Sequence, residues 1–400
     1  MTTQYANYEA LGVRPIINAQ ARLTRLGGSR MPPEVQEAMA GASRWYVDMF
    51  ELQRQVGARL AELTHNEAAY IATGAATALF LTSLATMVGS DPAALAQLPA
   101  LGPDAKDEII IHTAQRFTYD PAVRLAGARF VEIGTSGATA RWELEEAITP
   151  RTAAVLFVAG AHFQRGALAV EEVIEIAHAN ELPVIVDAAA QLPPVENLWR
   201  FTRDLGADMA IFSGGKDLRG PQSSGLVVGK QVWIDKIFAN GSPNPWVGRP
   251  MKVGREEMLG LLAAVERYLT LDHGARNAGF EEIVAGWMRT FDGLPGVSAT
   301  RAFPNEAGQP MPRVRIEFEP AIAGLSGDEA RYQLWEGNPR IAAGSAGALG
   351  PWLAHDLTDD TSRGIFLTAD TLDEGEEHVI TERLLEILSH ARSSVRRSAL

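Results

Sequence analysis

The sequence predicts an α/β protein with a mostly parallel sheet, followed by a smaller α+β region towards the C-terminus. In the middle of the chain, short runs rich in β-branched residues alternate with helical segments, as in parallel sheets joined by crossover helices. Most strand-like runs are largely apolar, as in Val184-Ile185-Val186, which indicates burial on both faces of a sheet. A chain of 400 residues, 46% of them apolar, is long enough for two or three domains with a large core.

The spacing of apolar residues along the chain predicts the individual helices and strands. The segment EEVIEIAHANE (171–181) has apolar residues at Val173, Ile174, Ile176 and Ala177, which predicts an amphipathic helix packed on the sheet. The other helices expected in order are 120–128, 143–148 and 256–271, with a C-terminal helix from about Glu374. The strands expected in order are 109–114, 129–134, 153–160, 184–189, 209–214 and 225–230, then 314–316 and 364–367.

The two ends of the chain differ from the middle. Residues 1–45 are expected to form an arm and a first helix, which Pro32-Pro33 can start. We therefore expect a large domain over 46–255, and a linking helix with a small α+β domain over 256–400.

The composition excludes several classes of protein. The absence of cysteine rules out disulfide scaffolds, thiol nucleophiles and Cys-ligated metal sites. The formal net charge of −13 disfavours non-specific nucleic-acid binding, which needs a basic face. No secretory signal pattern opens the chain, and its most apolar stretch, 75–88, is too short to span a bilayer. We expect a cytoplasmic protein that binds neither nucleic acid nor a membrane.

Two charged residues stand at the ends of successive predicted strands. Asp187 closes Val184-Ile185-Val186, and Lys216 follows the next strand after two glycines. Sheets of this class bind ligands at the carboxyl ends of their strands, and a buried Lys near a buried Asp is costly unless a ligand uses both. Pyridoxal phosphate needs this pair, because a lysine amine forms a Schiff base with its aldehyde and a carboxylate keeps its pyridine nitrogen protonated. A surface lysine and a helix-capping aspartate would explain either residue alone, but together the two predict a pyridoxal phosphate site.

A third segment, Thr73-Gly74-Ala75-Ala76-Thr77, stands between a short apolar run and a long helix. A helix N-terminus stabilises a phosphate through its backbone N–H groups, and small residues let the phosphate approach closely. Thr73 or Thr77 would add a hydroxyl donor, and Ser213 would reach the same phosphate. An ordinary threonine N-cap before a core helix explains the segment equally well.

The segment 186–230, which contains VDAAAQLPP and SGGKDLRGPQSSGLVVGK, resembles the fold type I pyridoxal phosphate enzymes. Within them it is similar to the selenocysteine-synthase-like branch of D-glucosaminate-6-phosphate ammonia-lyases and L-seryl-tRNA selenium transferases. Further matching segments cover most of the chain and lie at 8–19, 23–39, 51–64, 119–134, 248–257, 334–341 and 371–388. The resemblance implies the aspartate aminotransferase fold, with a mostly parallel seven-stranded sheet in the large domain and a small α+β C-terminal domain. It also implies a homodimer or larger homo-oligomer, because two subunits build each active site in this class.

The resemblance implies that Lys216 is the catalytic Schiff-base lysine and that Asp187 partners the pyridine nitrogen. With the phosphate segment, the residues expected at the cofactor are Thr73, Gly74, Ala75, Gln115, Asp187, Gln191, Ser213 and Lys216. Gly27 and Gly28 would approach the site with the arm.

The residues expected near the substrate depart from the family pattern. Where relatives often have a histidine that stacks on the cofactor ring, this chain has Gln115, so Gln115 or Phe117 is expected to substitute. The candidate substrate-binding residues are Thr24, Arg25, Arg116, His162, Arg219 and Arg340. An arginine suits a carboxylate or phosphate, but a surface salt bridge would explain any single one, and a structural role would explain His162. No spacing of histidines and carboxylates predicts a metal site.

The expected chemistry starts at the α-carbon of an amino acid. The Lys216 amine removes the α-proton, and the protonated ring accommodates the negative charge. If the β-carbon carries a hydroxyl or another leaving group, elimination yields an α-keto acid and ammonia, so an ammonia-lyase is the first hypothesis. Reprotonation from the other face would make a racemase or epimerase, and an aldolase or transaminase is more distant. A non-catalytic pyridoxal-phosphate-binding protein is the remaining alternative, and the net charge disfavours a tRNA-dependent selenium transferase.

Overall fold

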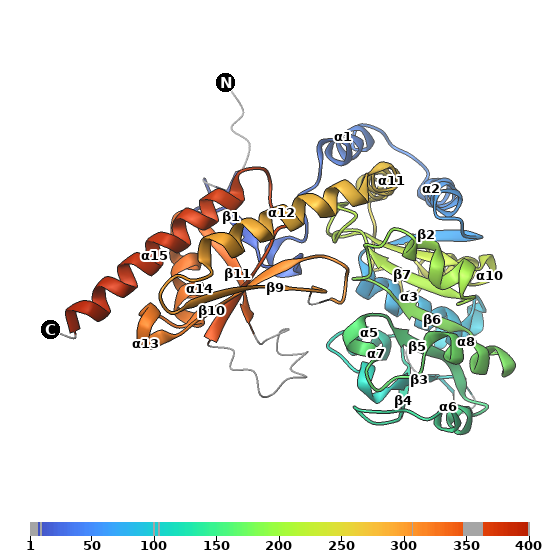
Figure 1. Ribbon diagram of the computed structural model, residues 1–400. Helices are drawn as coiled ribbons and strands as arrows, with labels where there is room; N and C mark the ends of the chain where they lie inside the picture. Colours follow the sequence, from blue (N-terminus) through green and yellow to red (C-terminus); the bar gives the residue numbers. More distant parts are fainter. Residues whose placement is uncertain are drawn as a thin grey trace. The chain divides into compact units, whose positions relative to one another are not determined.

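The computed structural model describes residues 7–8, 10–98, 101–102, 105–305, 307–346 and 363–398 (Figure 1). The chain divides into two compact units, a larger one of 27–271 with 307–309 and a smaller one of 1–26, 272–306 and 310–400. The domain limits expected after residues 45 and 255 stay a prediction. The units change after residues 26 and 271, so the first helix and the helix before residue 271 belong to the larger unit.

The larger unit is built on a seven-stranded sheet in which six strands run parallel. Across the sheet the strands follow the order β2 (Ala68–Ala72), β8 (Gly225–Gly229), β7 (Met209–Ser213), β6 (Val184–Asp187), β5 (Thr152–Val158), β3 (Glu108–His112) and β4 (Arg129–Ile133). Only β8 runs antiparallel, between β2 and β7. The predicted fold class is therefore confirmed for this unit.

Helices cover both faces of this sheet. One face carries α3 (Ala75–Val88), α5 (Asp120–Leu125) and α10 (Gln231–Asn240), and the other carries α2 (Met49–Leu63), α6 (Arg141–Ala147), α8 (Val170–Ala179) and α11 (Arg255–Thr270). Further helices are α1 (Pro33–Ala42), which packs on α11, and the short α4 (Pro92–Gln97), α7 (Ala161–Gln164), α9 (Asn197–Trp199), η2 (Thr113–Gln115) and η3 (Arg200–Asp204). Along β5, Val155 and Phe157 join the core on the α8 face, while Leu156 between them is equally buried on the other. Burial on both faces explains why the central strands β5 and β6 are largely apolar.

The smaller unit is α+β, as predicted. Its five-stranded sheet follows the order β1 (Ile16–Ala19), β11 (Arg340–Ala346), β12 (Gly364–Thr368), β10 (Arg313–Phe318) and β9 (Val297–Ala302), with β1 parallel to β11 and the other pairs antiparallel. Its helices are η1 (Thr24–Leu26), α12 (His273–Phe291), α13 (Pro320–Ala323), α14 (Gly327–Glu336) and α15 (Glu376–Ser398). The core of this unit includes Trp287, Leu334 and Leu384, one residue from each long helix. Within the described ranges, no helix combines the length and the hydropathy needed to cross a bilayer.

The buried His112 at the end of β3 is expected to make stability depend on pH. It is 0% exposed, its Nε2 accepts a hydrogen bond from Leu168 N at 3.3 Å, and burial lowers its pKa from 6.5 to about 4. The unfolded chain binds a proton on this ring below about pH 6.5, while the folded chain does not until about pH 4. His112 alone should therefore lower the free energy of unfolding by about 3 kcal/mol as the pH decreases from 6.5 to 4. Urea titrations at pH 7, 5.5 and 4.5 check this.

A His112→Gln variant is the control for that pH dependence. It is expected to be less stable at pH 7, but its free energy of unfolding should change less between pH 6.5 and 4. An equally steep fall in the variant would show that other groups cause the pH dependence.

Candidate active site

The carboxyl ends of β2, β7 and β6 lie at one edge of the larger sheet, and the strand register brings the predicted residues to this edge. Ala72 of β2 pairs with Gly225 of β8, and Gly225 pairs with Ser213 of β7. Because neighbouring strands are about 4.8 Å apart, the loop after β2 and the turn after β7 lie on the order of 10 Å from each other. The phosphate segment and the Lys216 turn are thus neighbours at this edge.

Asp187 is the last residue of β6 and is 5% exposed. Its Oδ1 accepts a hydrogen bond from Ala189 N at 3.0 Å, and among the described residues no hydrogen bond reaches Oδ2. Burial raises the pKa of the Asp187 carboxyl, while the Ala189 hydrogen bond and the charge of Lys216 act in the opposite direction. A buried carboxylate with one oxygen available suits a cationic group of a ligand, such as a protonated pyridine nitrogen.

Lys216 is half-buried in the turn that follows β7. Two hydrogen bonds fasten this turn to residues 29 and 30. Ser29 Oγ donates to Lys216 O at 2.7 Å, and Arg219 Nε donates to Arg30 O at 2.8 Å. The second bond comes from a residue with φ of +56°, a conformation that side chains other than glycine rarely adopt. Residues 29 and 30 therefore fix the position of the backbone that carries the Lys216 side chain.

Glycines allow this close packing of backbone on backbone. A Cβ on Gly28, whose φ is +73°, would lie 2.8 Å from Gly215 O, and a Cβ on Gly215 would lie 2.6 Å from Gln222 Cα. Neither approach leaves room for a side chain. Gly28, predicted to reach the site with the arm, thus contacts the Lys216 turn of its own chain.

The phosphate segment forms the N-terminus of α3. Gly74 is the N-cap residue with φ of +90°, and no side chain caps the helix. Thr73 Oγ1 donates to Ser223 O at 3.4 Å, and Ala75 and Thr77 lie half-buried in the first turn. The backbone N–H groups of that turn have no intrahelical partner, so they can serve an anion.

Replacing Gly225 with alanine is expected to distort this N-terminus. The new Cβ would lie 2.5 Å from Gly74 C and 2.9 Å from Ala75 N, and these backbone atoms would have to move. We expect a loss of about 1–3 kcal/mol in the free energy of unfolding, and weaker phosphate binding. Urea unfolding and a phosphate titration measure the two effects.

The control for Gly225→Ala is Gly41→Ala in α1, where a Cβ would meet no atom within 4 Å. A helical Gly→Ala change should stabilise by about 0.5–1 kcal/mol and leave phosphate binding unchanged. Equal effects of the two variants would contradict the close approach of β8 to α3.

The side-chain amides of two predicted cofactor residues, Gln115 and Gln191, form hydrogen bonds with backbone atoms near Asp187. Gln115 is fully buried, and its Oε1 accepts a hydrogen bond from Val158 N at 3.0 Å, on the residue that pairs with Asp187. Gln191 Nε2 donates to Ala307 O at 3.0 Å. Both side chains thus lie next to the Asp187 strand or the loop after it.

Three substrate candidates of the larger unit have partners within the protein. Arg116 donates to Asp120 at 2.5 Å and to Glu132, and its Cζ lies 4.8 Å from the Phe130 ring centroid. Arg219 binds the backbone of the arm, as described. The His162 ring in α7 lies 4.1 Å from the Phe163 ring.

The other three candidates lie in the smaller unit. Thr24 and Arg25 belong to η1, and Arg25 donates to Gln20 Oε1. Arg340 starts β11 and donates to Trp335 O at 3.0 Å, with its Cζ 4.7 Å from the Trp335 ring centroid.

Some residues that support the site had no sequence signal of their own. Ser29 and Gly225 matter through contacts with Lys216 and Gly74 that only the fold creates. Asp217, directly after Lys216, is 1% exposed and accepts a hydrogen bond from Tyr268 Oη at 2.8 Å. In the sequence, only its position next to Lys216 indicates that Asp217 lies near the site.

The chain is similar in sequence to one protein family and to several known enzymes. The family model described as SelA, L-seryl-tRNA selenium transferase, matches residues 22–277. The D-glucosaminate-6-phosphate ammonia lyase of Salmonella typhimurium is 32% identical over 390 residues, covering 96% of this chain and 98% of the relative. A 5′-C-glycyluridine monooxygenase-decarboxylase from Streptomyces is 35% identical over 341 residues, covering 84% of this chain and 83% of the relative.

Solved structures show the same fold. A D-glucosaminate-6-phosphate ammonia-lyase superimposes with a TM-score of 0.81 at 31% identity, covering 97% of this chain and 100% of that one. The cysteine desulfurase CsdA from Escherichia coli, at 18% identity, has a TM-score of 0.54 over 89% of this chain and 92% of its own, a likeness of fold alone. The predicted fold type I architecture is confirmed.

Proposed function

The chain belongs to the SelA family, whose model is described as L-seryl-tRNA selenium transferase, and we propose that within it this enzyme is a pyridoxal-phosphate-dependent ammonia-lyase. Its substrate is a β-hydroxy or otherwise β-substituted amino acid. The observation that carries the proposal is the buried Asp187 carboxylate beside the Lys216 turn, at the strand edge that also holds the uncapped N-terminus of α3. The resemblance stated from the sequence is confirmed by the family match.

The residues of this edge fit pyridoxal phosphate. Gly74 and Ala75 offer backbone N–H groups to the phosphate, Ser213 offers a hydroxyl, and Asp187 offers its available Oδ2 to the pyridine nitrogen. When bound, pyridoxal phosphate supplies a reactive aldehyde and an electron-withdrawing pyridinium ring that stabilises negative charge at a substrate's α-carbon.

The chain's own residues orient the reaction and move its proton. The Asp187 carboxyl, which accepts a hydrogen bond from Ala189 N, would stabilise the positive charge of a protonated pyridine nitrogen. Lys216 takes the proton from the α-carbon, and the Ser29 hydrogen bond fixes where the lysine side chain starts. Loss of a β-hydroxyl from the resulting carbanion leads, after hydrolysis, to an α-keto acid and ammonia.

The proposal is tested by product analysis. The purified enzyme with added pyridoxal phosphate is incubated with β-hydroxy amino acids of both configurations, and ammonia and α-keto acid are measured together. Equal amounts of the two products support a lyase. Loss of α-deuterium from the substrate without ammonia would instead show a racemase or epimerase, and no turnover with unchanged cofactor binding would show a non-catalytic protein.

A second candidate function comes from the 35% identical monooxygenase-decarboxylase. If this chain shared that activity, the products would include carbon dioxide and the reaction would consume oxygen. Running the product assay under argon separates the two candidates, because an ammonia-lyase needs no oxygen.

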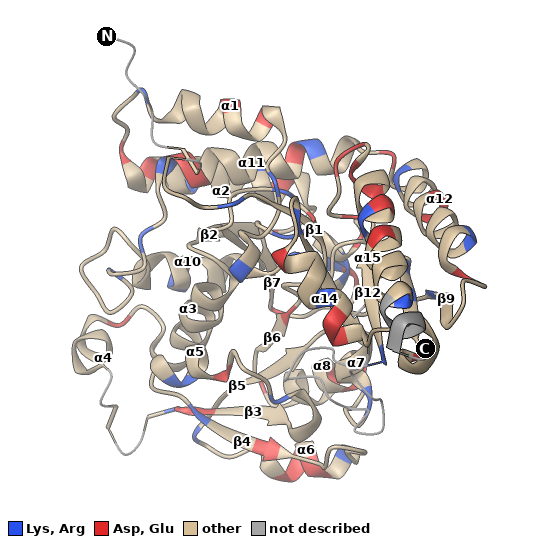
Figure 2. Ribbon diagram, turned by 90° about the vertical axis from the view of Figure 1, so that its left-hand side faces the viewer, with Lys and Arg blue, Asp and Glu red and all other residues tan. Residues whose placement is uncertain are grey.

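We also propose that the enzyme is a cytoplasmic homodimer or larger homo-oligomer that acts on a small molecule. Trp45 and Tyr46, between α1 and α2, are 73% and 100% exposed, and adjacent exposed aromatic side chains are typical of an interface. Acidic residues colour much of α6 in Figure 2, in keeping with the net charge of −13 and against nucleic-acid binding. Light scattering is expected to give at least twice the 43.1 kDa chain mass.

A further inference from the structure

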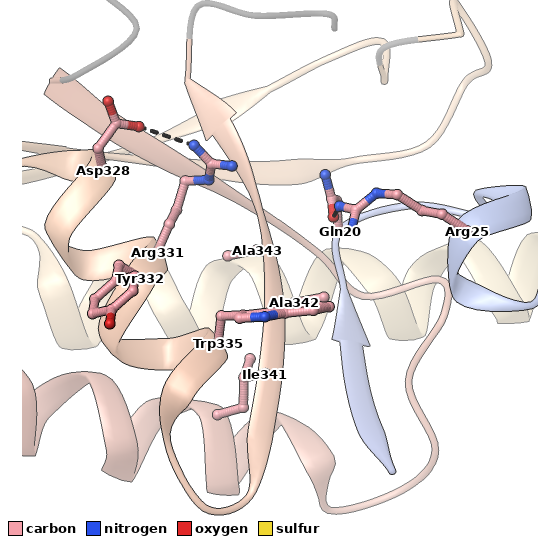
Figure 3. A pocket seen from close by; sticks show the side chains of 9 residues that line it. All are labelled: Gln20, Arg25, Asp328, Arg331, Tyr332, Trp335, Ile341, Ala342 and Ala343. Atoms are coloured by element: carbon pink, nitrogen blue, oxygen red, sulfur yellow. Dashed lines mark hydrogen bonds and ion pairs between the residues drawn. The ribbon is translucent and has the colours of Figure 1, made fainter. Parts of the chain in front are cut away.

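The smaller unit holds a pocket of about 330 Å³, lined in part by the substrate candidate Arg25. Its walls come from distant parts of the chain, namely the segment from Gln20 to Arg25, helix α14 and strand β11 (Figure 3). This volume falls in the range of small-molecule sites, which is roughly 300–1,000 Å³.

Trp335 of α14 and two arginines define the pocket. In Figure 3 the Arg331 guanidinium is turned towards Asp328, the Arg25 side chain extends towards Gln20, and the Trp335 side chain lies beside Ala342 of β11. The Arg25 Cζ lies 5.8 Å from the Trp335 ring centroid. Ala342 and Ala343 of β11 line the same pocket with small side chains.

The charges of the pocket are not balanced by its own residues. Arg331 Nη1 donates to Asp328 Oδ1 at 2.9 Å, but Arg331 Nε is buried without a hydrogen-bond partner. Arg25 is held by the neutral amide of Gln20 rather than by a carboxylate. Two guanidinium groups thus face one carboxylate, Asp328, whose side chain is 56% exposed. This excess of positive charge favours an anionic ligand.

We infer that this pocket binds a small organic anion, with its carboxylate or phosphate group between Arg25 and Arg331 and its carbon skeleton on the Trp335 ring. Planar guanidinium groups bind carboxylate and phosphate oxygens through two parallel hydrogen bonds. The Trp335 ring supplies apolar surface in this pocket, although the guanidinium groups of Arg25 and Arg340 also lie against it. The observations behind the inference all come from the smaller unit, and the inference concerns anion binding, not the reaction proposed above.

Isothermal titration of the whole protein with three probes tests the inference. Glucose 6-phosphate carries a phosphate on a carbon skeleton, gluconate carries a carboxylate, and inorganic phosphate carries the charge alone. At low ionic strength we expect glucose 6-phosphate or gluconate to bind at least 10-fold more tightly than inorganic phosphate. Which of the two binds more tightly identifies the anionic group. Absence of binding by both organic probes at millimolar concentration, or equal binding of all three probes, would overturn the inference.

Matched variants locate the binding. Arg331→Met and Arg25→Met should each weaken the tighter organic probe about 10-fold or more. Arg301→Gln is the control, because Arg301 pairs with Glu281 on the surface of the same unit and should not affect binding. Trp335→Leu should weaken the organic probe but not inorganic phosphate. If Arg331→Met unfolds, Arg25→Met and Trp335→Leu decide, and unchanged binding in both would overturn the inference. Ammonia release, measured separately, distinguishes this result from a failure of the proposed reaction.

Discussion

Replacing Lys216 with alanine is expected to lower turnover by about 10²–10⁴-fold, because the variant lacks the group that takes the α-proton. The fold should survive. The Lys216 side chain is half-buried, and the hydrogen bond from Ser29 Oγ goes to the backbone O of residue 216, which alanine keeps. Steady-state kinetics with the best β-hydroxy amino acid, together with the thermal midpoint of the variant, checks both statements.

The matched control is Lys236→Ala. Lys236 belongs to the same unit, and its Nζ lies 3.8 Å from the Trp233 ring centroid rather than at the strand edge. Its replacement should leave kcat within about 2-fold of the parent enzyme. Added methylamine should restore part of the activity of Lys216→Ala, since a small amine can replace the missing proton acceptor. Full activity of the uncomplemented variant would contradict the assigned role.

Asp187→Asn is expected to change stability and cofactor binding in opposite directions. Burial raises the pKa of Asp187, so the folded chain holds a proton on this carboxyl more tightly than the unfolded chain does. Stability from this group is therefore lost as the pH rises, because burial disfavours the ionised form of this carboxyl. An asparagine removes that charge, so the thermal midpoint of the cofactor-free protein should rise by a few degrees. Pyridoxal phosphate binding should weaken at least about 10-fold, because no negative charge then faces the pyridine nitrogen.

Asp208→Asn is the control for the stability effect. Asp208 is buried just before β7, and although burial opposes it, hydrogen bonds from Lys230 at 2.7 Å and His178 at 2.9 Å lower its pKa. Its stabilisation is present above the usual carboxyl pKa and is lost as the pH falls. Asp208→Asn should therefore lower the thermal midpoint at pH 7. A fall of equal size in Asp187→Asn would contradict the account of that carboxylate.

Much of the larger unit was predictable because its strands and helices have strong and different periods. The positions of Asp187 and Lys216 after successive strands predicted that these two residues meet at one edge of the sheet, and the fold brings them there. The pairing of β8 was not predictable, because an apolar run does not tell which strand it lies beside or in which direction. Strand β11 has few β-branched residues, and it forms because β1 and β12 offer hydrogen-bonding partners on both sides.

The supporting residues were harder to predict, because they act across long sequence separations. Ser29 contacts Lys216, and Arg25 shares a pocket with Arg331, but no local pattern links either pair. Arg116 follows a strand and looked suited to a substrate, yet Asp120 and Glu132 bind its guanidinium. Composition and spacing do not reveal whether an arginine already has a partner.

The most direct test of the account is the visible absorption spectrum of the purified protein after addition of pyridoxal phosphate and gel filtration. Sodium borohydride reduction and peptide mass mapping then locate any attached cofactor. We predict a visible band that persists through gel filtration, changes when a β-hydroxy amino acid is added, and corresponds to cofactor attached at Lys216. A protein that keeps no band, or that carries the cofactor on another lysine, would contradict the assignment of Lys216 and Asp187 and with it the proposed function.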